Sequence, residues 1–262
     1  HLSAGNPVCL EESGELAEIS ASLNKAGDYL LKKDNTRAEW IRGISHDIRT
    51  PLSIVLGYAS EIEDTVSLPE ATRKQAGIIR RYSEKLKNLV ADLNLTTKLE
   101  YSIQPLQKQK IDPVELARQV VSEVLNDGIS ELYELELSED TPGKNLSLVG
   151  DQALLSRMLN NLIRNCIVHN PDGCTIQVSV GSCDAMCTFS VADNGYGISE
   201  PQLNALNSGK DISSTQKQTG ETEHGLGLKI VMQIVKAHQG IIQFADTIPH
   251  GLSIHISLPM KL

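Results

Sequence analysis

Two long stretches of regularly spaced apolar residues constrain this chain of 262 residues more than any other feature. Residues 37–66 and residues 78–99 both place apolar side chains three and four positions apart, and the short break Ser67-Leu68-Pro69 separates the two stretches. That spacing is typical of a helix with one apolar face. The sequence therefore predicts two long helices joined by a short loop, which is an antiparallel helical hairpin.

Such a hairpin would leave a long apolar seam in contact with water. Pairing with a second copy buries the seam in a four-helix bundle, so we expect a homodimer. Pro51 stands inside the first helix, where it removes one backbone hydrogen bond and is expected to kink the helix locally. A narrower apolar seam of coiled-coil type begins earlier, from Glu11, and predicts a further helix ahead of the hairpin.

After Tyr101 the chain changes to short elements that alternate between strand and helix periodicity. Strands are expected at residues 106–111, 133–137, 145–149, 175–181, 186–192, 241–245 and 252–258. Helices are expected at residues 113–126, 152–168 and 225–237, the first two capped by Asp112 and Asp151. The polar segment 199–224 is predicted to be a mobile functional loop. Together these elements predict an α/β or α+β domain.

Composition narrows the class of protein. The chain has 24 Lys and Arg against 33 Asp and Glu, a net charge of −9, and no basic stripe, which argues against nucleic-acid binding. Its five cysteines show no metal-binding spacing and favour reduced thiols in a reducing compartment. No apolar run is long enough to span a membrane. The sequence starts at His1, shows no signal-peptide pattern and is expected to be a fragment.

The segment from Ser45 to Leu52, Ser-His-Asp-Ile-Arg-Thr-Pro-Leu, carries the first candidate site. His46 falls on the opposite side of the helix from the apolar seam and is expected to face solvent, where a neutral imidazole is a nucleophile. Asp47 could accept the other ring N–H and fix the tautomer. Thr50 lies one turn later on the same face, where its hydroxyl could hold a water. Taken alone, however, an exposed His beside an Asp is more often a solvated surface.

The whole string resembles the phospho-acceptor box of sensor histidine kinases, in which a His, an acid, an Arg, a Thr and a Pro stand in the same order on a helical hairpin. This resemblance implies that His46 takes the γ-phosphoryl group of ATP. It further implies that Asp47 orients or deprotonates His46, and that Thr50 positions water for the reverse, phosphatase reaction.

Asn161 and Asn165 are four positions apart and share one face of a predicted helix. Their amides could bind a hard cation or cap neighbouring backbone, and ordinary polar helix residues are an equally good interpretation without context. The string from Asn160 to Asn170 resembles the N box of the same kinases. By that resemblance Asn165 would bind Mg²⁺, and Asn161 and His169 would approach the phosphates of ATP.

Two glycine-containing strings complete the set. The first, Asp-Asn-Gly-Tyr-Gly-Ile at residues 193–198, follows a predicted strand, and its glycines permit a tight turn close to a ligand. The second, His-Gly-Leu-Gly-Leu at residues 224–228, opens a helix whose first N–H groups make an anion site. They resemble the two glycine boxes of the GHKL ATPase superfamily (gyrase, Hsp90, MutL and histidine kinases), in which the Asp binds adenine N6. The resemblance implies an ATP site formed by Asp193, Gly195, Gly197, Ile198, Gly225, Leu226, Gly227 and Leu228, with Ser253 helping to hold a water beside adenine.

The chain departs from the family at two places. Val168 stands where the family often has Lys, so one positive charge near the phosphates is missing. Arg164, Lys210 or Lys217 could supply that charge instead. The lid, residues 199–224, has no Phe and offers only Leu203 and Leu206 for docking. The string Glu-Glu-Ser-Gly-Glu-Leu from Glu11 resembles the second helix of a HAMP signalling module. The alternative interpretation is a plain coiled-coil segment ahead of the hairpin.

These features predict three parts: a HAMP-like helix at residues 1–36, a dimerisation and phosphotransfer hairpin at 37–103 and a GHKL-type (Bergerat) α/β sandwich ATPase domain at 104–262. The expected activity is Mg²⁺–ATP-dependent phosphorylation of His46, followed by transfer to an aspartate of a response regulator, in the cytoplasmic part of a membrane receptor. Two alternatives are open on the sequence alone: a nucleotide-binding signalling scaffold with weak catalysis, and a GHKL ATPase that forms no phosphoenzyme.

Overall fold

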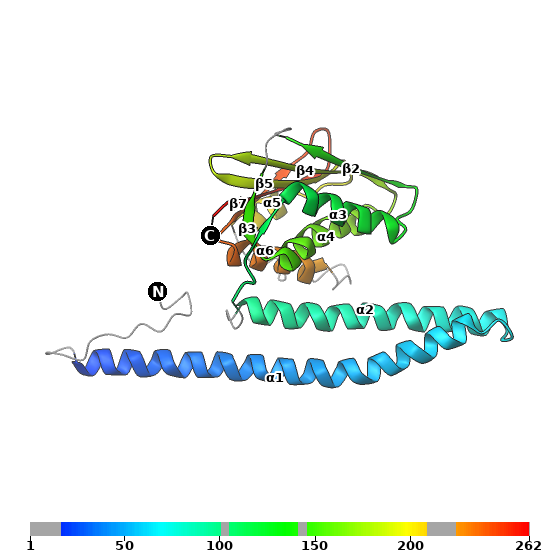
Figure 1. Ribbon diagram of the computed structural model, residues 1–262, viewed down its shortest axis with the longest axis horizontal. Coiled ribbons are helices and arrows are strands. Elements are labelled where there is room, and N and C mark those ends of the chain that lie inside the picture. Colours follow the sequence, from blue (N-terminus) through cyan, green and yellow to red (C-terminus); the bar gives the residue numbers. More distant parts are fainter. Residues whose placement is uncertain (1–16, 101–104, 141–145, 209–223, 262) are drawn as a thin grey trace. The chain divides into compact units, whose positions relative to one another are not determined.

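The computed structural model describes residues 17–100, 105–140, 146–208 and 224–261. The chain divides into two compact units, His1–Pro105 and Leu106–Leu262 (Figure 1). In the described residues, the first unit is helical and the second combines helices with a sheet, as the sequence predicts. Among the described residues, no helix has both the length and the apolar character needed to cross a bilayer.

The described part of the first unit is a hairpin of two long helices, α1 (Ala17–Asp64) and α2 (Glu70–Glu100), which contact each other. The two helical patterns expected on either side of residue 36 form the single helix α1. The helix also continues through Pro51 and curves along its C-terminal part (Figure 1). A proline inside a helix removes one backbone hydrogen bond, but here that loss does not end the helix.

Only part of the apolar seam packs α1 against α2. Those residues of the described hairpin that are buried have small side chains, which let the two helices approach closely: Ser45, Ala59, Ala76, Ser83, Thr96 and Thr97. Most of the large apolar side chains of the predicted seam remain exposed, among them Ile48, Val55, Ile62, Ile78, Tyr82, Leu86 and Leu93. As predicted, the hairpin alone leaves an apolar surface in water.

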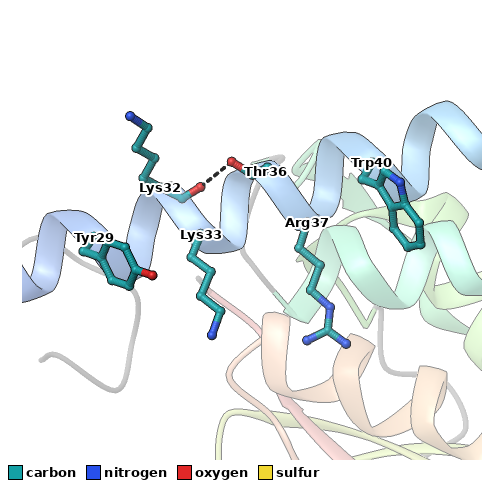
Figure 2. Close-up of a pocket in the computed structure, with 6 residues that line it drawn as sticks. All are labelled: Tyr29, Lys32, Lys33, Thr36, Arg37 and Trp40. Carbon is teal, nitrogen blue, oxygen red and sulfur yellow. Dashed lines mark hydrogen bonds between the residues drawn. The ribbon is translucent and has the colours of Figure 1, made fainter.

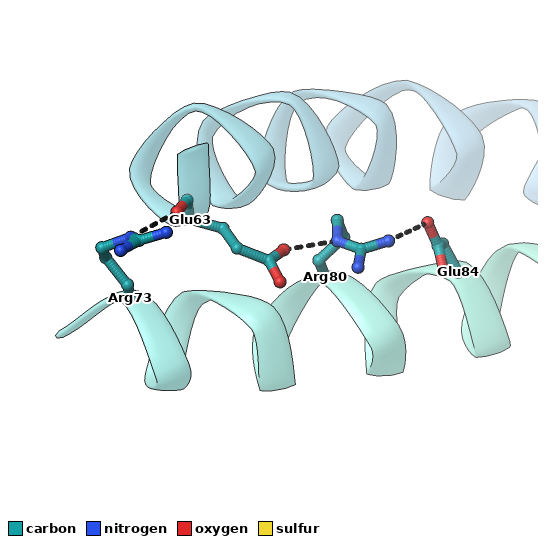
Figure 3. Close-up of polar contacts among 4 residues, drawn as sticks. All are labelled: Glu63, Arg73, Arg80 and Glu84. Atoms are coloured by element: carbon teal, nitrogen blue, oxygen red, sulfur yellow. Dashed lines mark hydrogen bonds and ion pairs between the residues drawn. The ribbon is translucent and has the colours of Figure 1, made fainter. Parts of the chain in front are cut away.

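A polar cluster ties the two helices near the connecting loop (Figure 3). Arg80 of α2 donates from Nε to Glu63 Oε2 of α1 at 2.6 Å, and its Nη1 lies 3.1 Å from Glu84 Oε1. Arg73 donates from Nε to the backbone oxygen of Glu63 at 2.8 Å. The hydrogen bond from Arg80 is the main reason that the pKa of Glu63 is lowered. The cluster therefore fixes the register of α1 against α2 where the chain reverses.

The second unit contains a five-stranded sheet with the order β2-β4-β5-β7-β6, in which β2 and β4 are parallel and the other neighbours are antiparallel. Its strands are β2 (Tyr133–Glu139), β4 (Cys174–Cys183), β5 (Met186–Asp193), β6 (Ile241–Asp246) and β7 (Leu252–Pro259). The strands β1 (Gln109–Ile111) and β3 (Leu148–Gly150) form a separate two-stranded sheet. All of the predicted strands are therefore present.

Helices α3 (Pro113–Asn126), α4 (Gln152–His169) and α6 (His224–Ala237) cover one face of the sheet (Figure 1). Buried side chains alternate along the strands, so that Val178, Val191 and Ile254 form one row across β4, β5 and β7 beneath this layer. Asp112 and Asp151 cap α3 and α4 with their side chains, as predicted. The result is an α/β sandwich.

One prediction for this unit is wrong. The sequence predicts a segment without secondary structure at 199–224, but this segment begins with a helix, α5 (Glu200–Asn207). Ser199 precedes this helix, and both its N–H and its hydroxyl donate to Gln202 Oε1, at 3.0 and 2.7 Å. Leu206 of α5 is buried, which removes it as a lid-docking residue. Residues 209–223 of the predicted lid lie outside the described residues.

Candidate functional site

His46 lies on the exposed side of α1. Its side chain is 77% exposed and that of Asp47 is 83% exposed, with His46 Nδ1 and Asp47 Oδ1 3.4 Å apart. When Nδ1 carries the proton it can donate to Asp47, which leaves Nε2 as the nucleophilic nitrogen. Thr50 lies on the same side, where its hydroxyl donates to the backbone oxygen of His46 at 3.4 Å. The expected orientation of the three residues is thus present.

Asp193 lies at the end of β5 in the row of side chains that faces the helices. It pairs with Ile176 of β4 and is buried. Its Oδ1 accepts the N–H of Gly195 at 3.0 Å. Burial, and after it the nearby charge of Asp193, raises the pKa of the Cys166 thiol of α4. The carboxylate is thus held in place and keeps acceptor capacity for a donor such as an exocyclic amine.

The turn after Asp193 is closed by the loop between β6 and β7. Gly197 has a φ of +67° and Gly251 a φ of +130°, conformations that favour glycine. A Cβ on Gly251 would lie 1.9 Å from the backbone oxygen of Asp193, and the Thr247 hydroxyl donates to the same oxygen at 2.8 Å. Two chain segments, the turn after β5 and the loop between β6 and β7, therefore meet here.

Asn165 of α4 approaches the start of α6. A Cβ on Gly227 would lie 3.5 Å from Asn165 Oδ1, so the amide stands against the first turn of α6. Within the part of the chain that the structure describes, the buried Nδ2 of Asn161 has no hydrogen-bond partner. A buried donor without a partner is costly unless a ligand satisfies it. An amide oxygen beside a helix N-terminus is suited to a cation and an anion together, so these residues fit Mg²⁺ and a phosphate group.

The remaining predicted residues have the following places. Leu226, Gly227 and Leu228 are half-buried in the first turns of α6, and Gly225 is the second residue of that helix. His169 is exposed at the end of α4, and Ile198 is half-buried after the turn. Ser253 is buried on β7 beside Ala192, with its hydroxyl oxygen 2.9 Å from His255 Nε2.

Among the alternative cations for Val168, Arg164 already has partners. Its Nε donates to Asn160 Oδ1 at 2.9 Å, and its Nη2 lies 3.5 Å from Asp127 Oδ2. Lys210 and Lys217 lie outside the described residues.

The structure therefore brings together the predicted residues of α4, β5, β7 and α6 in the second unit. His46, Asp47 and Thr50 belong to the first unit. Sequence reasoning missed Asn170, which links α4 to the turn after Asp193, and it missed Cys166 and Thr247. A polar residue at the end of a predicted helix was the only available signal for Asn170.

A shallow pocket lies elsewhere, on α1 (Figure 2). Tyr29, Lys32, Lys33, Thr36, Arg37 and Trp40 line it, all from one helix. None of the predicted site residues contributes to it. The pocket is therefore a feature of the α1 surface that is distinct from the candidate site.

Two family models match the chain. Residues 36–102 match the His Kinase A (phospho-acceptor) domain, and residues 150–262 match the histidine kinase-, DNA gyrase B- and HSP90-like ATPase. The first contains the hairpin with His46, and the second contains the α4, turn and α6 residues described above.

Curated relatives match almost the whole chain. The sensor histidine kinase YvrG of Bacillus subtilis is 30% identical over 91% of this chain and 43% of its own length. The histidine-protein kinase BaeS of Escherichia coli is 28% identical over 94% of this chain and 52% of its own. The chain thus spans about half the length of these relatives.

Solved structures show the same fold. Full-length ShkA in complex with AMPPNP aligns with a TM-score of 0.67 and 24% identity, over 84% of this chain and 45% of that one. The complex of the histidine kinase ThkA with the response regulator TrrA aligns with a TM-score of 0.56 and 21% identity, over 87% and 64%.

The hairpin and the sandwich together define a protein with a phospho-acceptor domain followed by an ATP-binding ATPase domain. The chain belongs to the sensor histidine kinases of two-component systems.

Proposed function

We propose that this chain phosphorylates itself on His46 with ATP and passes the phosphoryl group to an aspartate of a response regulator. The observation that carries the proposal is the exposed His46–Asp47 pair, which lies in a phospho-acceptor domain ahead of an ATPase domain in the same chain. In the reaction, His46 Nε2 bonds to the γ-phosphorus, the bond from phosphorus to the ADP oxygen breaks, and Asp47 orients His46 or takes its proton.

The second unit would bind the nucleotide. Asp193 would accept a hydrogen bond from the adenine amine, Ser253 would help to hold a water beside the base, and the first turn of α6 would receive the phosphates. Asn165 would bind Mg²⁺ through its amide oxygen, with Asn161 and His169 near the phosphates. When bound, Mg²⁺ would neutralise phosphate charge, and the chain's own residues would supply positioning, which is most of what phosphoryl transfer requires.

The test is incubation with γ-labelled ATP and Mg²⁺. The parent chain should acquire an acid-labile, alkali-stable label, as expected of phosphohistidine. His46→Gln should lose the label but bind ATP with nearly unchanged affinity, because the nucleotide residues lie in the other unit. Asp193→Asn should lose both the label and ATP binding.

His250→Gln is the matched control, because His250 is an exposed histidine that has no place in the proposed chemistry. It should keep the label. Persistent labelling of His46→Gln would disprove the acceptor assignment. Steady phosphate release that is indifferent to His46→Gln would instead indicate an ATPase without a phosphoenzyme.

We further propose that Thr50 supports a phosphatase activity by positioning water near the response-regulator phosphoaspartate. Its exposed place on the same side of α1 as His46 supports this role. Thr50→Ala should keep autophosphorylation and slow dephosphorylation of the response regulator. Equal dephosphorylation rates in both proteins would reject the role.

The proposed partners are a second copy of the chain, through the exposed apolar face of the hairpin, and a receiver domain of a response regulator. The complex of ThkA with TrrA supports the second partner by analogy. We also propose that the chain is the cytoplasmic part of a longer, membrane-anchored sensor, since its relatives are sensor kinases about twice as long. The domain boundaries at residues 36 and 103 and the HAMP-like helix remain part of this proposal. A scaffold without catalysis is not favoured, because the relatives are kinases.

A further inference from the structure

Asn170 joins α4 to the turn that follows Asp193. It is the residue directly after α4 and is only 2% exposed. Its Nδ2 donates to the backbone oxygen of Cys166 at 2.8 Å, and its Oδ1 accepts the backbone N–H of Tyr196 at 2.9 Å. One buried amide thus satisfies two backbone groups that are 30 residues apart in sequence.

The same amide explains why residue 195 is a glycine. A Cβ at this position would lie 1.8 Å from Asn170 Oδ1 and 2.1 Å from its Cγ. Gly195 is not among the glycines with positive φ, in contrast to Gly197. The need for a glycine at residue 195 therefore comes from the contact with Asn170 and not from a left-handed backbone.

Gly195, which packs against Asn170, also connects to the carboxylate of Asp193. The N–H of Gly195 donates to Asp193 Oδ1, so a shift of Gly195 moves the donor that orients this oxygen. Asn170 also holds the backbone oxygen of Cys166, a residue near enough to Asp193 for the carboxylate charge to raise the pKa of its thiol. Asn170 therefore holds the turn whose Gly195 N–H orients Asp193, and it ties that turn to the end of α4.

We propose that Asn170 is a positioning residue of the nucleotide site: it holds the turn after Asp193 so that the carboxylate meets the exocyclic amine of adenine. The role rests on the ATP binding proposed above. Because the amine distinguishes adenine from guanine, a displaced carboxylate should weaken ATP binding and also reduce the preference for ATP over GTP.

The test compares the dissociation constants of Mg²⁺–ATP and Mg²⁺–GTP, measured by calorimetry on the full chain. Asn170→Ala should weaken ATP binding at least about tenfold, the effect of losing a buried hydrogen-bond pair, and lower the ratio of ATP to GTP affinity. Gly195→Ala should do the same from the other side of the contact. Since the amide causes the clash, the double variant Asn170→Ala/Gly195→Ala should bind ATP about as well as Asn170→Ala alone.

Asn207→Ala is the matched control. The Asn207 amide also bridges two segments through two backbone hydrogen bonds, from Nδ2 to the oxygen of Phe244 at 2.9 Å and from the N–H of Phe244 to Oδ1 at 3.0 Å. This variant should show a lower Tm and keep both the ATP affinity and the base preference.

Parent-like ATP affinity in Asn170→Ala would overturn the role, and so would an equal loss of ATP affinity in Asn207→Ala. Additive losses in the double variant would also overturn it. If the parent binds ATP and Asp193→Asn does not, such results reject the role of Asn170 alone. If the parent binds no ATP, the proposed function itself fails.

Discussion

His238 shows what a single buried side chain does for the second unit. It is fully buried after α6, where Nδ1–H donates to the Ile234 oxygen at 2.8 Å and Nε2 accepts the N–H of Asp151 at 3.0 Å. Burial lowers the pKa of His238, and Lys108 acts in the same direction, while the Ile234 carbonyl and Asp151 oppose them. The folded protein therefore holds this imidazole neutral.

The neutral state of His238 makes stability depend on pH. Below the unfolded pKa of about 6.5 the unfolded chain binds a proton that the folded chain does not, so this contribution is complete above pH ~6.5 and falls on acidification by up to about 1.4 kcal/mol per pH unit. Urea unfolding of the parent at pH 7.5 and 5.5 should show the loss. His238→Gln should be about 2 kcal/mol less stable at pH 7.5, from two lost hydrogen bonds, and should lose less on acidification.

His250→Gln serves as the control for this measurement, because His250 is exposed. It should retain the pH dependence of the parent. An unchanged pH dependence in His238→Gln would show that other groups cause the acid sensitivity.

Residues whose roles depend on local spacing were predictable from the sequence, and residues whose roles depend on tertiary contacts were not. The spacing of Asn161 and Asn165 alone places them on one helix face. Asp193 ends a strand that the alternation of apolar and polar residues predicts from the sequence. Asn170 and His238 offered no such signal. Each stands at a polar helix end, and its burial arises only when distant segments pack on it.

At the scale of elements, the N-cap of α3 allows the contribution of a capping side chain to stability to be measured. Asp112 Oδ1 accepts the N–H groups of Val114 and Glu115 at 2.9 and 3.1 Å, and Pro113 follows it. Asp112→Ala should cost about 1 kcal/mol in urea unfolding, whereas Asp112→Ser retains an acceptor and should cost less. Equal losses in the two variants would mean that the cap hydrogen bonds contribute little.

The elements that were predicted incorrectly also have physical causes. α5 begins with Ser199 and Gln202, a capping pair that its polar sequence concealed because Leu203 and Leu206 are its main apolar residues. α1 is one helix because no helix-breaking residue stands between its two apolar patterns, although the apolar spacing is interrupted there. Periodicity finds the faces of helices more reliably than their ends.

At the scale of the whole molecule, the exposed face of the hairpin is the main surface left without a partner in one copy of the chain, among the residues that the structure describes. Tyr82 and Leu86 of α2 are 58% and 52% exposed, and Ile48 and Val55 of α1 are exposed as well. Burial of a large apolar side chain contributes about 1.5–3 kcal/mol, so several of them in one seam can hold two hairpins together.

Leu86→Glu should therefore convert the proposed dimer into a monomer, because it would place a charge in the seam that the proposed bundle buries. Light scattering over a range of concentrations measures the mass directly. Leu125→Glu is the matched control, since Leu125 is 48% exposed but lies on α3 in the second unit, and it should leave the mass unchanged. Both variants should still bind ATP, because every proposed nucleotide residue lies in the second unit. If Leu86→Glu keeps the mass of the parent dimer, the second copy contacts a different surface, and the exposed face of the hairpin must be assigned to another partner.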